Sequence, residues 1–323
     1  MLDALVIGAG PVGLACALEI QRRGLAVAVV EKGALVNSII GYPTNMEFFS
    51  TPELLEIGGH PFPTAHYKPL REDALDYYQR VAATEKLALR LHERVLGLDG
   101  ERGNFVVRTD RGELRARHVV VATGFYDLPN PLGVPGADLP HVSHYYKEPY
   151  HHARQNVVVI GAKNSAAKAA LALTRAGARV TLLVRGPDVS PSVKYWIRPD
   201  LLNRIAEGRI TAHFQAVVEA ITPAAVHART PAGPVAVPAD FVYALTGYRP
   251  DEALLGRLGI APDPQDDARA PLFDPVTHQT NRPGVYVAGT VCGGRATSRW
   301  FIENGRHHAQ LIAAHIGNLS NAF

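Results

Sequence analysis

The chain is poor in cysteine: Cys16 and Cys292 are the only two thiols among 323 residues. They form no Cys-x-x-Cys pair and no set with the spacing of metal ligands, which excludes a disulfide scaffold and a zinc module, and we expect no metal site. Scarce cysteine without a pattern is typical of proteins in a reducing compartment. We therefore expect a cytoplasmic protein.

Long apolar runs and an excess of charge of one sign are also lacking. No stretch of about 18 apolar residues occurs, so no membrane span is expected, and the first residues lack the basic and apolar regions of a signal peptide. The net charge is only +3, without runs of Lys and Arg interleaved with aromatics, so we expect no nucleic-acid partner. The chain is 47% hydrophobic and long enough for two domains with a core each.

The start of the chain contains a complete strand–helix–strand pattern. Residues 4–7 form a short apolar run, residues 11–23 have helical spacing, and residues 26–30 form a second apolar run that ends at Glu31. An apolar run followed by glycine is typical of a buried parallel strand. The pattern predicts one βαβ unit.

The turn between the first strand and the helix reads Gly8-Ala9-Gly10-Pro11-Val12-Gly13. In such a GxGxxG motif the first glycine permits a tight turn, the second lets the backbone approach a pyrophosphate, and the third lets helix and strand pack closely. The phosphates lie at the helix N-terminus, where unpaired N–H groups favour anions. Glu31 stands where a carboxylate accepts hydrogen bonds from ribose hydroxyls. These residues predict a dinucleotide site.

A second unit of the same kind follows in the middle of the chain. Residues 157–160, 164–176 and 179–184 predict another strand, helix and strand. The turn between the first two reads Gly161-Ala162-Lys163-Asn164-Ser165-Ala166. Lys163 occupies the place of the middle glycine, where its ammonium can face a pyrophosphate. We expect a second nucleotide site here.

The two units differ at the end of their second strand, where the first has Glu31 and the second has Arg185. An acid there repels a 2′-phosphate, whereas Arg can clamp one, so the second site favours NADPH over NADH. Lys194 lies nearby in the sequence and adds positive charge. One site for a dinucleotide with free ribose hydroxyls and another for NADPH imply FAD at the first.

The rest of the chain predicts further helices and strands. Residues 33–68, rich in Gly, Pro and aromatics, are expected to form a long functional loop. A hairpin turn is expected at Asp110-Arg111-Gly112. Helices are expected at 71–86 and 298–316, and strands at 105–108, 112–116, 118–122, 215–221, 225–229, 240–245 and 285–288.

The domain organisation follows from the two nucleotide units. Residues 123–150, rich in Pro, Gly and His, mark a crossing between domains. We expect an α/β fold with two Rossmann-like dinucleotide-binding domains: an FAD domain of residues 1–125 and 245–323, and an inserted NADPH domain of residues 126–244.

Several longer segments make the chain resemble a known family. They are Gly8–Gly13, Tyr42–Thr44, Phe48–Ser50, Gly136–Pro140, Lys163–Ala166, Ser190–Ser192, Tyr195–Ile197 and Phe301–Gly305. Over essentially its whole length the chain resembles the thioredoxin-reductase-like flavoproteins and, more closely, the bacillithiol disulfide reductase (YpdA-like) family. The resemblance implies NADPH-driven, FAD-mediated reduction of a small-molecule thiol disulfide, bacillithiol disulfide, by a homo-oligomer (dimer or tetramer).

The motifs and the resemblance together predict which residues contact each cofactor. Those predicted for FAD are Gly8, Gly10, Pro11, Val12, Gly13, Glu31, Lys32, Tyr42, Val95, Thr123, Gly124, Gly289, Thr290, Phe301 and Ile302. Those predicted for NADPH are Gly161, Lys163, Asn164, Ser165, Ala166, Arg185, Lys194 and Gly247.

The chain departs from the family pattern in its thiols. Thioredoxin reductases carry Cys-x-x-Cys in the NADPH domain, which this chain lacks, and Val12 stands where bacillithiol reductases often have cysteine. Thr290 replaces the common acid after the last Ala-Gly, where its hydroxyl can still hydrogen-bond the flavin ribityl chain. Cys16 and Cys292 are the candidate catalytic thiols, although their positions favour a packing role for each.

Other functions stay open at this stage. A flavin-dependent monooxygenase is suggested by His144-Tyr145 after Gly136, although the full monooxygenase motif is missing. A ferredoxin or flavodoxin–NADP reductase of similar fold and a non-enzymatic, NADPH-binding redox regulator are further alternatives. Surface or hinge positions are expected for His141, His144, His151, His152, His307 and His308.

Overall fold

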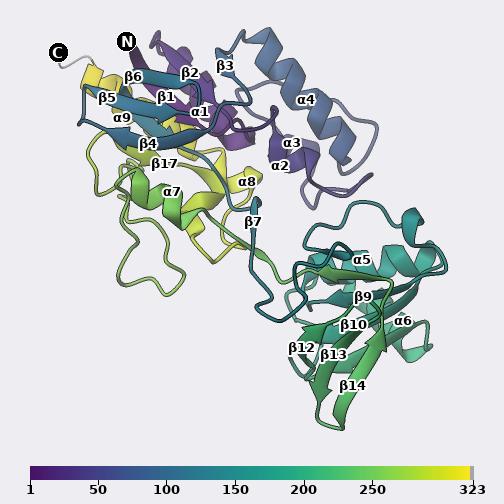
Figure 1. Cartoon of the computed structure of the whole chain (residues 1–323). Helices are drawn as coiled ribbons and strands as arrows, with labels where there is room; N and C mark the ends of the chain where they lie inside the picture. Colours follow the sequence, from purple (N-terminus) through teal and green to yellow (C-terminus); the bar gives the residue numbers. More distant parts are fainter. Residues whose placement is uncertain (321–323) are drawn as a thin grey trace. The chain divides into compact units, whose positions relative to one another are not determined.

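The computed structural model describes residues 1–320 and divides the chain into two compact units (Figure 1). Unit 1 consists of Met1–Gly41, Asn45–Leu128 and the chain from Tyr248 onward, and unit 2 consists of Tyr42–Thr44 and Pro129–Gly247. The sheets are mixed in unit 1 and mainly parallel in unit 2, which confirms the predicted α/β class. The cofactor that belongs to each unit remains a prediction.

Unit 1 is built on a seven-stranded sheet with helices packed against it. Its elements in chain order are β1 (Leu2–Ile7), α1 (Pro11–Gln21), β2 (Val27–Val30), α2 (Asn37–Ile40), α3 (Pro52–Leu55), α4 (Arg71–Thr84), β3 (Leu89–Arg90), β4 (Val95–Asp99), β5 (Phe105–Thr109), β6 (Gly112–Val121), α7 (Glu252–Arg257), β17 (Val285–Val287), the 3₁₀ helix η2 (Gly289–Gly293), α8 (Ile302–Gly305) and α9 (His308–Ser320).

The predicted first βαβ unit is confirmed. Strands β1 and β2 pair in parallel, with Ala4 opposite Val27 and Ile7 opposite Val30. Helix α1 is buried on nearly every side because it packs between the sheet and α9. An amphipathic stripe would not suit this position, so the helix is apolar almost throughout.

Strand β6 is longer than predicted. The sequence pattern placed two strands at 112–116 and 118–122, but one strand runs from Gly112 to Val121. Its first half pairs antiparallel with β5 across the predicted turn at Asp110, and its second half pairs in parallel with β17 on the same edge. Arg117 does not end the strand because its side chain occupies an exposed position.

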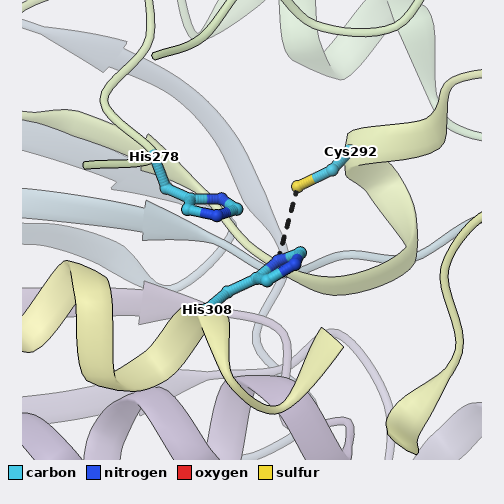
Figure 2. Close-up of side chains that lie close together, drawn as sticks. All are labelled: His278, Cys292 and His308. Atoms are coloured by element: carbon cyan, nitrogen blue, oxygen red, sulfur yellow. Dashed lines mark hydrogen bonds between the residues drawn. The ribbon is translucent and has the colours of Figure 1, made fainter. Parts of the chain in front are cut away.

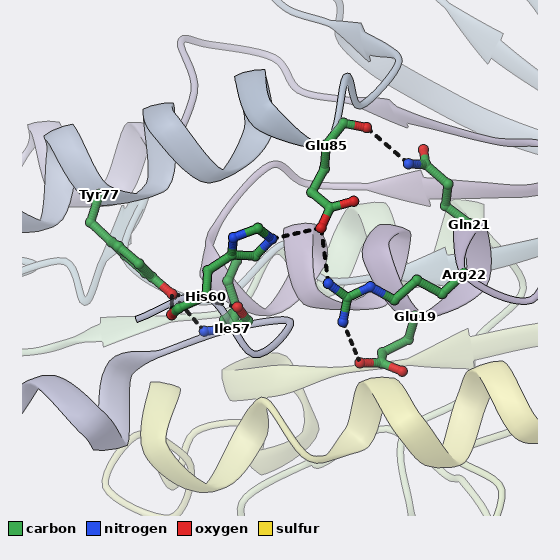
Figure 3. A network of polar contacts seen from close by, with 7 residues as sticks. All are labelled: Glu19, Gln21, Arg22, Ile57, His60, Tyr77 and Glu85. Carbon is green, nitrogen blue, oxygen red and sulfur yellow. Dashed lines mark hydrogen bonds and ion pairs between the residues drawn. The ribbon is translucent and has the colours of Figure 1, made fainter. Parts of the chain in front are cut away.

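The expected loop at 33–68 is ordered and contains α2 and α3. A turn at residues 57–60, which includes Gly58, closes with a hydrogen bond from the amide of His60 to the carbonyl of Ile57 (3.1 Å). A polar network around Ile57 and His60 holds this turn in place (Figure 3). The phenol of Tyr77 accepts a hydrogen bond from the amide of Ile57 (2.9 Å) and donates to the carbonyl of His60 (2.8 Å). The imidazole of His60 lies 2.6 Å from Glu85, which also pairs at 2.9 Å with Arg22, the residue directly after α1.

The predicted helix at 298–316 was wrong in its extent. The structure has the short helix α8 and then, after a break at Arg306 and His307, the longer helix α9. The chain turns at the start of α8 because Asn304 Oδ1 accepts a hydrogen bond from the amide of Phe301 (2.7 Å). Gly305 ends α8 and packs closely against Gly289, because a Cβ on Gly305 would lie 3.2 Å from the Gly289 Cα.

Unit 2 has a parallel sheet in the order β11-β10-β9-β15-β8 and a separate antiparallel sheet of three strands. Its elements are β8 (Val142–Ser143), the 3₁₀ helix η1 (Tyr150–His152), β9 (Asn156–Ile160), α5 (Asn164–Arg175), β10 (Arg179–Val184), α6 (Arg198–Ala206), β11 (Ile210–Phe214), β12 (Val217–Ile221), β13 (Ala225–Thr230), β14 (Gly233–Pro238) and β15 (Phe241–Ala244). Strand β7 (Leu128–Pro129), in which the chain passes from unit 1 to unit 2, pairs with β16 (Tyr248–Arg249).

The second predicted βαβ unit is confirmed as β9, α5 and β10, which pair in parallel. The predicted strand at 215–221 begins later, at Val217, because Gln215 has a positive φ of 51° and turns the chain between β11 and β12. Within residues 1–320, no helix is long and apolar enough to cross a membrane.

Candidate nucleotide sites

The first glycine loop joins β1 to α1 with little freedom. Gly8 has φ +108°, and a Cβ on it would lie 2.6 Å from the carbonyl oxygen of Ala122 at the end of β6. A Cβ on Gly13 would overlap the carbonyl oxygen of Gly8. Both positions therefore require glycine for the backbone itself.

Gly10 is different from its two neighbours in the motif. Its φ is −72°, and a Cβ there would meet no atom of the described residues within 4 Å. The fold therefore does not require glycine at this position, and its missing side chain leaves open space at the N-terminus of α1. The first N–H groups of a helix have no partner within the helix, so this space suits a pyrophosphate.

Glu31 is buried at the end of β2 and is held by the glycine loop. Its Oε2 accepts a hydrogen bond from the amide of Ala9 (3.0 Å), and its Oε1 accepts one from Gly33 (2.9 Å). A carboxylate can accept about four hydrogen bonds, so two remain for ribose hydroxyls. The carboxylate thus supports the shape of the loop as well as the predicted ribose contact.

The carboxyl ends of the neighbouring parallel strands β1, β6 and β17 bring the other predicted FAD segments together. Thr123 and Gly124 follow β6, and a Cβ on Gly124 would lie 3.3 Å from Thr290 Oγ1, just after β17. Gly289 packs against Val12, because a Cβ on it would lie 3.0 Å from the Val12 Cβ. Ligands of open α/β sheets bind at this edge, where the strand order reverses.

The remaining predicted FAD residues are more scattered. Lys32 forms an ion pair with Asp127 at 2.7 Å, and the side chain of Val95 is buried in the core beside the sheet. Pro11 is the first residue of α1, and Phe301 and Ile302 form the start of α8. Tyr42 belongs to unit 2, whereas the other predicted FAD residues belong to unit 1.

The second glycine loop repeats the geometry of the first at Gly161. This residue has φ +146°, and a Cβ on it would lie 2.6 Å from the carbonyl oxygen of Leu245 after β15. Ala166 packs 3.1 Å from that Cβ position, so alanine fits where the motif ideally has glycine. Lys163 precedes α5 with an exposed side chain, and Ser165 in its first turn is exposed as well.

Asn164 holds the loop that follows β10. Its Nδ2 donates to the carbonyl of Ser192 (3.1 Å), and its Oδ1 accepts from the amide of Lys194 (3.0 Å). Arg185, directly after β10, is exposed, and Lys194 has its Nζ 5.8 Å from the ring of Trp196. The predicted 2′-phosphate residues therefore stand on one loop that Asn164 braces.

Gly247 is the last residue of unit 2 and has φ +90°. Its carbonyl accepts a hydrogen bond from the amide of Asn130 (2.9 Å), and the side chain of Asn130 donates to Thr246. Gly247 turns the chain where it leaves unit 2, and its contact with NADPH stays a prediction.

The two candidate catalytic thiols are both buried. Cys16 is fully buried in α1, and burial raises the pKa of its thiol to about 12, with a further contribution from Glu19. Cys292 is buried in η2, and burial also raises its pKa. Because the thiolate is the reactive form, this environment favours packing over redox chemistry, and the catalytic role of either residue stays a prediction.

One side-chain cluster in unit 1 was not foreseen. The structure brings His278, Cys292 and His308 together in the core, with one ligand atom of each within 4.8 Å of the others (Figure 2). The surface or hinge position expected for His308 is wrong, because it packs under the loop after β17, where burial lowers its pKa to about 3. The same expectation is wrong for His152, which is buried in unit 2 with its Nε2 2.8 Å from the phenol oxygen of Tyr243. The sequence offered no signal for this cluster, since its members lie far apart and follow no ligand spacing.

Comparison with known proteins places these features in a family. Residues 5–289 match the model of the pyridine nucleotide-disulphide oxidoreductase family. The chain is 42% identical to bacilliredoxin reductase Bdr of Bacillus subtilis over 98% of both chains. The solved bacillithiol disulfide reductases Bdr (YpdA) of Bacillus cereus and Staphylococcus aureus each superpose with a TM-score of 0.95, at 39% and 38% identity, over 98% and 100% of this chain and 99% of theirs. The chain belongs to the pyridine nucleotide-disulphide oxidoreductase family.

Proposed function

We propose that this protein reduces bacillithiol disulfide with electrons from NADPH, which pass through FAD. The protein is an oxidoreductase whose cofactors are FAD and NADPH. The observation that carries the proposal is the first glycine loop, where the fold itself does not require Gly10 to be glycine and the open space lies at a helix N-terminus. The choice of disulfide rests on the similarity to the two solved bacillithiol disulfide reductases.

The residues around the first loop fit FAD. The N-terminus of α1 would hold the pyrophosphate, Glu31 would accept hydrogen bonds from the adenosine ribose, and Thr290 would face the ribityl chain. The ends of β1, β6 and β17 converge at this place. These assignments rest on the loop geometry and on the open space at Gly10.

The residues around the second loop fit NADPH. The N-terminus of α5 would hold the pyrophosphate with help from the exposed Lys163, and Arg185 would clamp the 2′-phosphate. Asn164 holds the loop beside Arg185 in place through two hydrogen bonds. When bound, the two cofactors supply the hydride transfer, and the protein supplies their orientation.

The overall reaction consumes one NADPH and one proton for each disulfide and releases NADP⁺ and two thiols. Both cysteines of this chain are buried, so we propose that no protein thiol relays the electrons. Cys16→Ser and Cys292→Ser, alone and together, are then expected to keep turnover within about twofold of the unmodified enzyme. A loss of about a hundredfold in either variant, with flavin content intact, would assign that thiol a catalytic role.

The test of the substrate is a panel under NADPH. Purified protein is expected to be yellow, and NADPH is expected to bleach it anaerobically faster than NADH does. Bacillithiol disulfide should accelerate NADPH oxidation, whereas cystine and glutathione disulfide, as control disulfides, should not. No response to bacillithiol disulfide would contradict the proposal.

A second acceptor is suggested by the Bacillus subtilis relative, whose name describes a bacilliredoxin reductase. The same assay with an oxidised bacilliredoxin separates the two acceptors. Rapid oxygen use with a hydroxylated product would instead indicate the flavin monooxygenase, and turnover with ferredoxin or flavodoxin alone would indicate the corresponding NADP reductase. The cytoplasmic location and the dimer or tetramer also remain part of the proposal, and sedimentation of the purified protein measures the second.

A further inference from the structure

The interior of unit 1 holds three buried side chains that can each offer a metal ligand. His278 precedes β17, Cys292 lies in η2, and His308 begins α9 (Figure 2). One ligand atom from each lies within 4.8 Å of the others. We propose that these three side chains bind one thiophilic d¹⁰ metal ion, Cu⁺ or Zn²⁺, because thiolate and imidazole are the ligands that such ions select.

The Cys292–His308 pair is already close to the separation that a shared ion requires. Its Sγ and Nδ1 atoms lie 3.9 Å apart. Bonds of ~2.3 Å to sulfur and ~2.0 Å to nitrogen, at trigonal or tetrahedral angles, place the two donor atoms ~3.5–3.7 Å apart. A gap at the 4.8 Å limit would have to close by about 1–1.5 Å, since two imidazole nitrogens on one ion lie ~3.3–3.5 Å apart.

The tautomer of His278 is one that a metal ligand needs. Its Nδ1 donates a hydrogen bond to the carbonyl oxygen of Val287 (3.1 Å), which leaves the lone pair on Nε2. Metal-binding histidines almost always donate their second ring N–H to such an acceptor. The ring also stacks on Phe273, with centroids 5.1 Å apart, and this contact limits its rotation.

His308 connects the cluster to the predicted flavin site. Its Nδ1 accepts a hydrogen bond from the amide of Gly289 (3.1 Å), so its proton lies on Nε2, which is buried without a hydrogen-bond partner among residues 1–320. A neutral imidazole has only one lone pair in the ring plane. An ion that binds His308 at either nitrogen therefore ends the hydrogen bond from Gly289.

Loss of the hydrogen bond from the Gly289 amide has a structural consequence. Gly289 and Thr290 begin η2 and belong to the predicted FAD contacts, so binding of the ion releases the start of that segment. The thiol of Cys292 loses its proton to solvent as the sulfur–metal bond forms. Ion affinity therefore falls as the pH falls.

The test is metal uptake by the full-length, FAD-loaded protein after reduction and treatment with a chelator. Equilibrium dialysis uses Zn²⁺ in one arm and anaerobic Cu⁺ in the other, so the arms identify the ion. We expect one equivalent per chain for the unmodified protein and for the control Cys16→Ala. Affinity should fall at least about tenfold in Cys292→Ser and in His278→Gln.

Two further measurements use the unmodified protein and do not depend on how the variants fold. Co²⁺ should give visible d–d bands of a thiolate-bound ion at wavelengths beyond the flavin absorption. The peptide that contains Gly289 should exchange its amide hydrogens faster when the ion is bound. The proposal would be overturned if neither Zn²⁺ nor Cu⁺ were taken up stoichiometrically. Equal uptake by Cys292→Ser, or unchanged amide exchange of the Gly289 peptide at full occupancy, would also overturn it.

Discussion

Gly10 has a side-chain position that no described residue of the fold fills. A Gly10→Ala variant is therefore expected to unfold at the same temperature as the unmodified protein when both lack flavin, while it retains much less FAD. Gly256→Ala is the matched control, because its Cβ also meets nothing within 4 Å and its φ is not positive. The measurements are the ratio of flavin to protein absorbance after gel filtration and a thermal melt. Equal flavin retention in the two variants would show that the pyrophosphate does not lie at Gly10.

Arg185 tests which nucleotide the second loop selects. Arg185→Gln should raise the KM for NADPH by about 10- to 100-fold, since a charge-assisted hydrogen bond contributes roughly 1.5–3 kcal/mol. The KM for NADH should stay nearly constant, because NADH has no 2′-phosphate. Arg209→Gln, at another exposed arginine of unit 2, serves as the control. A parallel rise of KM for both nucleotides would assign Arg185 another role.

The residues that could be predicted from the sequence are those that one short segment brings together. Gly8 directly follows β1, Gly13 lies in the first turn of α1 and Glu31 directly follows β2, so their spacing along one βαβ unit determined their relative places. The cluster of Cys292 and His308 could not be predicted, because it depends on where η2 and α9 pack after the chain breaks between α8 and α9. That break is a tertiary feature without a local pattern.

At the scale of elements, strong apolar patterns were sufficient to predict the βαβ units, whereas weak patterns did not predict strand length or short helices. The βαβ units were predictable because buried parallel strands are continuous apolar runs. The length of β6 was not, since its two halves pair with different partners on the same edge. The segment at 33–68 was expected only as a functional loop, because its short helices and the network around Tyr77 have no periodicity.

The network around Tyr77 predicts how firmly that loop is held. Tyr77→Phe leaves the Ile57 amide and the His60 carbonyl without their buried partner, so we expect a loss of about 1–3 kcal/mol in the free energy of unfolding. Proteolysis should become faster at the turn that contains Gly58. Tyr150→Phe, at a tyrosine that is 76% exposed, is the control and should change neither quantity. Urea unfolding and limited proteolysis provide the two readouts. If the two variants gave the same free energy of unfolding and the same rate of proteolysis, the network would not stabilise the loop.

For the whole molecule, the acid limit of stability depends on buried histidines. His118 lies within β6 with its Nδ1 buried and without a hydrogen-bond partner among residues 1–320, and burial lowers its pKa from 6.5 to about 4, with smaller contributions from Arg102 and His315. Between these two values the unfolded chain binds a proton that the folded chain does not. The free energy of unfolding therefore falls as the pH falls from about 6.5 towards 4.

His118→Gln removes this proton-binding group, so the free energy of unfolding should depend less strongly on pH. At pH 5 the His118 imidazole should have lowered the free energy of unfolding of the unmodified protein by at most about 2 kcal/mol, because solvent screening reduces this contribution. The variant has no imidazole at this position and loses no stability from it. Part of the acid loss persists in the variant, because burial also lowers the pKa of His278. Urea unfolding at pH 7.5 and pH 5 measures the difference for both proteins. A loss of equal size in the two would mean that His118 takes up its proton in the folded protein as readily as in the unfolded chain.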